Sequence, residues 1–272
     1  MSDGPETEVR TEVSFPKFKP GSREYVITAG DARLNIERLH IPSDHTIKVS
    51  RDVTSIEWSV KTISFGERAR LDLAAREPRP AKPATPPAIP GQADHGKLGR
   101  LGTPGTPGAP GRNGVSLTLL DVREIENLGS LWISTDGANG GDGGDGGQGQ
   151  KGGGPRNRGL PFFGKKAAKG GYGGDGGHGG RGGDTSTVVI RLRYPHHTTT
   201  FISGISSGEP PGWKGGSTGV IAIYGSPGKG GRGGNGGPGG PGGEANVPHG
   251  TPGRSGQPGP NGTYIAVVTR HD

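Results

Sequence analysis

Residues 170–184 read GGYGGDGGHGGRGGD, which is five consecutive Gly-Gly-X triplets. Neither an α-helix nor a β-strand repeats every three residues. The backbone with that period is the left-handed polyproline-II type helix, which has no internal hydrogen bonds. Because glycine lacks a Cβ at two of every three positions, neighbouring segments can approach closely and pair N–H with C=O. This stretch therefore predicts a polyglycine-II helix bundle built from several such segments.

Four further blocks repeat glycine with the same period. Blocks 137–153 and 225–243 carry two glycines per triplet, so we expect them inside the bundle. Blocks 96–114 and 250–262 carry one glycine in three, so we expect them at its edges. Only these last two read as collagen-like, and both are short for a triple helix. The blocks together predict about five polyglycine or polyproline-II helices.

Composition limits the fold and the compartment. Only 27% of the 272 residues are hydrophobic, which leaves no large apolar core, and no cysteine is present to form a disulfide or a thiolate metal site. Residues 1–13, MSDGPETEVRTEV, are polar, and no long apolar run follows. We therefore expect no Sec signal peptide and no membrane span, with a virion, an extracellular assembly and the cytoplasm all left open. The net charge of +7 suits anionic partners, although a solvated basic surface explains it equally.

The remaining segments predict β structure. Residues 56–60 alternate apolar and polar side chains, which is the period-two pattern of a half-buried strand. The fold class expected is mainly β: a small antiparallel N-terminal β domain, either a β-sandwich or a jelly-roll-like module, plus a β platform that carries the bundle. The expected strands are 25–27, 34–36, 47–49, 56–60, 71–73, 115–122, 130–134, 187–194, 219–224 and 263–269. The expected divisions are a flexible segment 1–21, the β domain 22–76, a Pro-rich linker 77–95 and the platform with its bundle 96–272.

The stretch GGYGGDGGHGGRGGD followed by TVVIRL resembles the glycine-rich domain of Obg-type GTPases. That resemblance, over about residues 130–270, implies polyglycine helices projecting from a β-barrel and an intracellular module that binds RNA or ribonucleoprotein. It implies no nucleotide hydrolysis, because no GTPase domain accompanies it. The layout is also similar in architecture to the tail-fibre-tip adhesins of T-even-like phages, which implies loops presented to a host surface.

Motifs for catalysis or cofactors are not supported. G-x-G-x-x-G arises here by triplet repetition, and residues 159–165 fit a phosphate loop only until Lys166, where Ser or Thr should hold magnesium. Four aspartates lack the nine-residue period of calcium repeats and are read as solvated charge: Asp142, Asp145, Asp175 and Asp184. We therefore expect no enzyme, no catalytic residue, no cofactor and no metal.

Two loops are candidates for recognition. The insert 154–169 combines cations with adjacent aromatic residues and contains no acid: Arg156, Arg158, Phe162, Phe163, Lys165, Lys166 and Lys169. Such a loop suits an anionic glycan, a lipid headgroup or nucleic acid, although both phenylalanines could instead cap the bundle. The second loop, 195–216, carries His196, His197, Phe201 and Trp213, with the same two interpretations.

These features predict a non-enzymatic structural and binding protein. The β domain would attach it to a larger assembly or to copies of itself through open strand edges. The glycine bundle would serve as a stiff spike or fibre that presents loops to a surface, as in an adhesin. The alternative is the intracellular Obg-like module that binds RNA or ribonucleoprotein.

Overall fold

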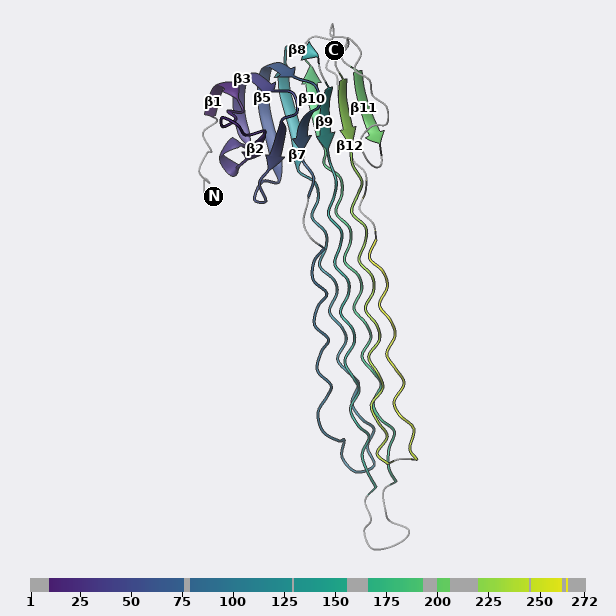
Figure 1. The fold of residues 1–272 in the computed structure, drawn as a ribbon. Helices are drawn as coiled ribbons and strands as arrows, with labels where there is room; N and C mark the ends of the chain where they lie inside the picture. The colour runs from purple at the N-terminus through teal and green to yellow at the C-terminus, as the bar shows by residue number, and fades with distance from the viewer. Residues whose placement is uncertain are drawn as a thin grey trace, which may run out of the picture.

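A computed structural model describes residues 10–75, 79–128, 130–155, 166–192, 200–205, 220–244, 246–260 and 263. Figure 1 shows two parts: a group of β-strands, here called the head, and a long set of extended segments that projects from it, here called the stalk. The stalk leaves from one end of the strands, so the chain passes repeatedly between head and stalk.

The head consists of two sheets in which every pairing of strands is parallel. The first sheet has the order β1-β3-β5-β7-β10, with β8 also paired to β5: β1 Arg10–Phe15, β3 Arg33–Ile41, β5 Ser55–Phe65, β7 Ser116–Val122, β8 Glu124–Leu128 and β10 Val188–Leu192. The second has the order β11-β12-β9-β6-β4-β2: β2 Glu24–Ile27, β4 Thr46–Val49, β6 Ala69–Asp72, β9 Ser130–Ser134, β11 Thr200–Ile205 and β12 Val220–Tyr224.

The first strands of the head form a parallel coil. The chain alternates between the two sheets, so each turn adds one strand to each of them. Successive turns stack at nearly the same offset: Leu34 pairs with Trp58 and Ile47 with Leu71, both 24 residues apart, and Tyr25 pairs with Ile47 at 22 residues. Hydrogen bonds between side chains, such as His40 Nδ1 with Ser64 Oγ at 2.7 Å, repeat the same separation of 24 residues. The head is therefore a solenoid of stacked turns.

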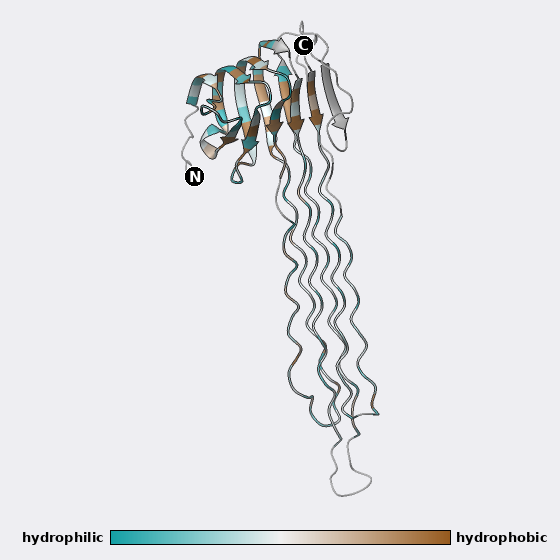
Figure 2. Ribbon diagram, viewed as in Figure 1, coloured by the Kyte–Doolittle hydropathy of each residue, from teal (hydrophilic) through white to brown (hydrophobic). Residues whose placement is uncertain are grey.

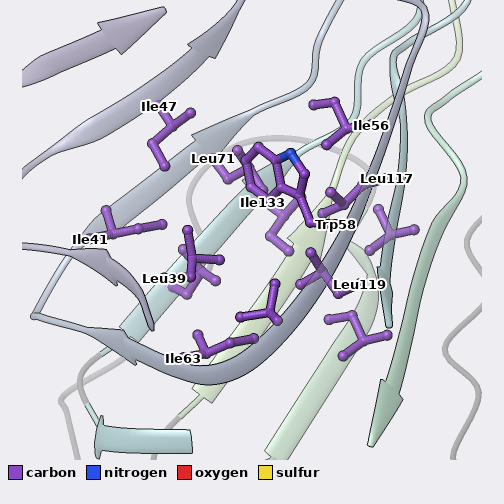
Figure 3. Packing of buried hydrophobic residues seen from close by; sticks show 14 of the residues in the cluster. Leu39, Ile41, Ile47, Ile56, Trp58, Ile63, Leu71, Leu117, Leu119 and Ile133 are labelled. Atoms are coloured by element: carbon purple, nitrogen blue, oxygen red, sulfur yellow. The ribbon is translucent and has the colours of Figure 1, made fainter. Parts of the chain in front are cut away.

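The core lies between the two sheets. Alternating apolar residues of each strand point inward, as the hydropathy colours of the head and the close view in Figures 2 and 3 show. Trp58 and Phe65 are fully buried there. Trp58 Nε1 donates to the backbone oxygen of Asp31 at 2.7 Å, and the Phe15 ring packs edge-on against Trp58 at 5.3 Å. The chain has few apolar residues, but those in the head are packed together and form a hydrophobic core.

The fold class predicted from the sequence is wrong. The strands of the supposed N-terminal domain are parallel, and β5 pairs with β7 and β6 with β9, so they share both sheets with the platform strands. Within the described ranges the only helical element is the 3₁₀ turn Ala29–Asp31. The glycine segments have no assigned helix, so a polyglycine-II helix bundle is replaced by extended chain. An alternating pattern shows that a strand has a buried face, but it does not show the direction of its neighbour.

Most expected strands are found where the sequence placed them. The strands at 25–27, 34–36, 47–49, 56–60, 71–73, 115–122, 130–134, 187–194 and 219–224 each overlap a strand of the head. Three strands were missed, since β1 lies in the segment predicted to be flexible, β8 lies in an expected turn and β11 lies in the expected loop 195–216. The expected strand 263–269 lies outside the described residues apart from Thr263.

The stalk is made of six segments that alternate in direction. They are 79–95, 96–114, 135–155, 166–186, 225–244 and 246–260, numbered one to six below. Every glycine from 170 to 183 in segment four donates its N–H to a neighbouring segment. Gly174 donates to Gly147 of segment three at 2.9 Å, and Gly176 donates to Arg254 of segment six at 2.8 Å. The stalk is therefore held together by lateral backbone hydrogen bonds that repeat every third residue.

Segment one belongs to the same network, although the sequence suggested a linker. Ala93 donates to Lys151 at 2.9 Å, and Arg79 pairs with Asp142 at 3.2 Å. Lys82 pairs with Asp145 at 2.8 Å. Described residues from 79 to 95 thus run beside segment three.

Glycine is required where the backbones meet. A Cβ built on Gly146 would lie 1.9 Å from the oxygen of Gly174, and one on Gly176 would lie 2.1 Å from the oxygen of Gly234. No side chain fits at such distances, and the obstructing atoms are backbone, which cannot rotate away. The close approach explains why glycine recurs at these positions.

Side chains complete the hydrogen bonding of the non-glycine positions. Four acceptors of segment three take the N–H groups of residues 90 positions ahead in segment five: Asp136 from Ser226, Asn139 from Lys229, Asp142 from Arg232 and Asp145 from Asn235. The next two residues at this offset are Pro238 and Pro241, which have no N–H, and they face Gln148 and Lys151. Acceptors therefore occur where a donor needs one.

The offset of 90 residues also joins stalk to head. β9 and β12 are paired with that same offset, as in Ser130 with Val220. Segments two and four likewise keep the offset of 71 that pairs Leu117 with Val188, since Asn113 Oδ1 accepts the N–H of Asp184 at 2.8 Å. The register set in the sheets thus continues into the stalk without a shift.

Candidate functional site

The end of the stalk farthest from the head is formed by three reversals of the chain (Figure 1). In the first, Lys97 N–H donates to Asp94 at 2.9 Å, and Gly96 adopts a φ of +71°, which favours glycine. In the second, Val247 N–H donates to Glu244 at 3.1 Å. The third joins segments three and four between residues 155 and 166.

Backbone hydrogen bonds fix the chain around these reversals. Gly96 donates to Gly154 at 3.0 Å, and Gly243 donates to Ala168 at 2.9 Å. His95 Nδ1 lies 3.4 Å from the same Gly154 oxygen. The side chains at the end of the stalk are therefore carried on a connected framework.

Three large apolar side chains are exposed next to these reversals. Leu98 is 66% exposed, Leu101 is 60% exposed and Tyr172 is 55% exposed. They belong to adjacent segments, because Gly99 donates to Lys169 at 3.2 Å and Gly102 donates to Tyr172 at 2.8 Å. Along the described stalk these are the only exposed large hydrophobic residues, so they form one apolar surface.

Cations accompany these apolar residues on the same two segments of the stalk. Lys169 Nζ lies 5.5 Å from the centre of the Tyr172 ring, and Arg100 and Lys166 are exposed. The backbone N–H of Arg100 donates to Gln150 Oε1 at 3.2 Å, which fixes the backbone that carries the guanidinium group. We call the six residues Leu98, Arg100, Leu101, Lys166, Lys169 and Tyr172 the distal patch.

The nearest acids are few. Asp94 pairs with Lys97 at 3.0 Å in the first reversal, and Glu244 lies in the second. Farther along the stalk the carboxylates are occupied by neighbours. A hydrogen bond from Lys82 lowers the pKa of Asp145, and hydrogen bonds from the Thr263 side chain and backbone lower the pKa of Asp184. The distal patch thus combines positive charge with exposed apolar area, which suits an anionic, partly apolar partner.

The residues predicted for recognition are only partly placed. Lys166 and Lys169 lie in the distal patch. Arg156, Arg158, Phe162, Phe163 and Lys165 lie outside the described residues, as do His196, His197 and Trp213 of the second loop. Phe201 lies in β11, and its side chain is not described.

Four residues of the distal patch were missed in the sequence, namely Arg100 and the three apolar residues. Leu98 and Leu101 occupy the same place in consecutive triplets of GKLGRLG, and Tyr172 is the non-glycine residue of its triplet. The signal in the sequence was that apolar residues recur every three residues in block 96–114, which was expected at the edge of the bundle, where such side chains are exposed. The four aspartates read as solvated charge also have a structural role, because all of them accept backbone N–H groups.

The head offers one small hollow in the part of the chain that the structure describes. It has a volume of roughly 220 Å³ and is lined mainly by the starts of β3, β5 and β7, with Arg33 and Glu57 as its charged residues. Ligand pockets for drug-sized molecules are larger, about 300–1,000 Å³. No group of three or more His, Asp or Glu residues within the described ranges is arranged to hold a metal ion.

No family model, no curated protein and no solved structure matches this chain. The resemblances to Obg-type domains and to phage tip adhesins therefore stay predictions. Among the described residues, no helix is both long enough and apolar enough to cross a membrane.

Proposed function

We propose that this protein is a non-enzymatic structural spike that holds a recognition surface at a distance from its head. The observation that carries the proposal is the continuous register between sheets and stalk. β9 and β12 are paired with an offset of 90 residues, and Asp136, Asn139, Asp142 and Asp145 keep that offset along the stalk. A projection tied laterally along its length, and joined to a packed core, resists bending at its base.

The distal patch supplies the surface that such a spike would present. Its cations and exposed apolar residues lie within a few residues of the chain reversals at the far end of the stalk. Lys and Arg outnumber Asp and Glu along the described stalk, whereas the two are nearly balanced in the head. The partner of the proposed spike is therefore an anionic surface.

The head is the end that would attach to an assembly or to further copies. Among the described strands, β1 pairs only with β3 and β2 only with β4, so each sheet has an edge strand on this side of the coil. Val13 is 77% exposed and Val26 is 50% exposed on these two strands. Open edges with apolar side chains favour the addition of another chain.

Negative-stain electron microscopy of the purified protein tests the spike. We expect compact heads that each carry one straight rod, alone or joined through their heads. Compact particles without rods, or rods that bend freely at the head, would contradict the proposal.

Binding to sulfate-bearing beads tests the recognition end without assuming a biological partner. Neutralising Arg156, Arg158, Lys165 and Lys166 together should abolish binding and leave the melting temperature nearly unchanged. Binding of the wild-type protein should also weaken steeply with salt, because contacts to many fixed charges release counterions. Equal binding by the quadruple variant would show that the insert 154–169 has no role in recognition.

A further inference from the structure

We propose that the distal patch docks on the surface of an anionic lipid bilayer. This inference rests on the proposed function, since it names the partner of the spike's recognition end. The patch is defined by Leu98, Leu101 and Tyr172 as apolar residues and by Arg100, Lys166 and Lys169 as cations.

The apolar half of the patch favours a lipid partner. Leu98 and Leu101 occupy equivalent places of successive triplets, and Leu101 lies beside Tyr172 across the Gly102–Tyr172 hydrogen bond. Aliphatic side chains gain free energy when they enter the boundary between headgroups and acyl chains. Tyrosine is enriched at that same depth, because its ring is apolar and its hydroxyl stays hydrated.

The charged half of the patch is placed to bind headgroup phosphates. Lys169 is held over the Tyr172 ring, so its charge lies beside the residue that would enter the interface. Arg100 and Lys166 are exposed, and they lie near the far end of the stalk in segments two and four. Long cationic side chains can keep their charge at the phosphate level while their stems lie along apolar surface.

The same chemistry is less suited to the other anionic polymers. Nucleic acid and sulfated glycan would also attract the cations, but neither offers an apolar layer that two leucines can enter. Binding to those polymers would depend on charge alone. The leucines therefore separate a bilayer from other anionic partners.

The experiment is co-sedimentation of the full-length protein with vesicles. One vesicle set mixes phosphatidylcholine with phosphatidylserine, the anionic lipid whose surface potential attracts basic segments, and the other is phosphatidylcholine alone. The L98S/L101S variant removes apolar area, with T103S/T106S at exposed positions farther along the same segment as its control. The R100Q/K169Q variant removes two charges, with K229Q/R232Q near the head end of the stalk as its matched control.

We expect the wild-type protein to bind the anionic vesicles and to bind neutral vesicles at least tenfold more weakly. R100Q/K169Q should lose affinity by about fivefold for each cation removed, and L98S/L101S should lose a similar amount. Neither control should change binding by more than about twofold. Heparin beads provide the comparison, and there L98S/L101S should bind like the wild-type protein.

Absence of binding to anionic vesicles would overturn the inference. So would vesicle binding that L98S/L101S leaves unchanged, since it would show attraction by charge alone. Because all six residues of the distal patch lie on the surface of the stalk, the circular dichroism spectrum and the melting temperature should not change in any variant. A straight rod by electron microscopy with no vesicle binding would overturn the lipid inference alone, whereas loss of the rod would overturn the spike itself.

Discussion

The carboxylate of Asp142 accepts the backbone N–H of Arg232, 90 residues ahead in the chain, at 2.7 Å. The same Oδ1 atom lies 3.2 Å from Arg79 Nη1 of segment one. One side chain of segment three thus links the segments on either side of it. An acceptor that satisfies a specific backbone donor fixes the relative position of two segments, because a shift by one residue would leave the donor without it.

Two substitutions of Asp142 distinguish the contribution of its hydrogen bond to Arg232 from that of its ion pair with Arg79. Asp142→Ala removes the acceptor and should lower the free energy of unfolding by about 0.5–1.5 kcal/mol. Asp142→Asn keeps an oxygen that can accept the N–H of Arg232 and should have a smaller effect. Urea unfolding monitored by circular dichroism measures both, and equal losses for the two variants would show that the ion pair with Arg79 matters more.

Substitution of an interior glycine should be far more damaging than removal of an outer carboxylate. A Cβ on Gly176 would lie 2.1 Å from the Gly234 oxygen, so Gly176→Val must push two backbones apart, at a cost of about 1–3 kcal/mol or more. The adjacent Asp175→Ala only removes an exposed acceptor of the Arg254 N–H. Thermal melting compares the two variants, and equal tolerance would mean that the segments are not closely packed.

The stalk should become less stable in acid. The Lys82 side chain and the Asn235 N–H lower the pKa of Asp145 below the ordinary 3.8, and bonds from Thr263 do the same for Asp184. A carboxyl group with a lowered folded-state pKa contributes stability that is fully present above its unfolded pKa. That contribution is lost as the pH falls below about 4 through the folded values.

Melting temperature measured between pH 6 and pH 2 checks this dependence. The Asp145→Asn variant should show a shallower decrease at low pH than the wild-type protein, because one of the titrating groups is gone. A melting temperature that rises as the pH falls through this range would reverse the sign and contradict the prediction.

Trp58 should be the most sensitive residue of the head. It is fully buried, it packs against Phe15, and its Nε1 donates to the Asp31 oxygen at 2.7 Å (Figure 3). Trp58→Ala should cost about 3–5 kcal/mol through the cavity and the unpaired oxygen. Trp58→Phe fills most of the space and should cost less. Chemical unfolding followed by circular dichroism measures both, and a change below 1 kcal/mol for Trp58→Ala would place the residue outside the cooperative core.

Self-association should depend on the open edges of the head. Val13 of β1 and Val26 of β2 are exposed next to backbone groups that have no partner strand within the described sheets. Val26→Lys adds a charge at such an edge, which natural proteins use to prevent pairing. Sedimentation velocity over a range of concentrations should show association for the wild-type protein and less for the variant. A wild-type monomer at all concentrations would contradict the prediction.

Most strands of the head could be predicted because they have one buried face. Residues 55–65 alternate along most of β5, and such a pattern is visible without knowing the partner strand. The parallel direction was missed, although a signal was present. Leu34 and Trp58, Ile36 and Val60, and Ile47 and Leu71 are all 24 residues apart, which is the period of a solenoid.

The stalk was predictable in its period but not in its partners. Glycine at every third residue indicated close contact between backbones, but the contacts join different segments at very different separations, such as 27 residues for Gly174 with Gly147 and 70 for Gly102 with Tyr172. The distal patch was predicted only through Lys166 and Lys169. Its apolar half depends on which segments become neighbours, and no local pattern specifies that.

The matched offsets have a consequence for how such a protein can change in length. A triplet added to segment three alone, ahead of Asp145, would move every later acceptor of that segment away from its donor. It would bring Asp145 opposite Pro238, which has no N–H to donate. A longer stalk instead needs one additional triplet in every segment, inserted at the same distance from the head. The reach of the molecule can therefore change only in steps of one triplet, and each step requires insertions at several distant positions in the gene at once.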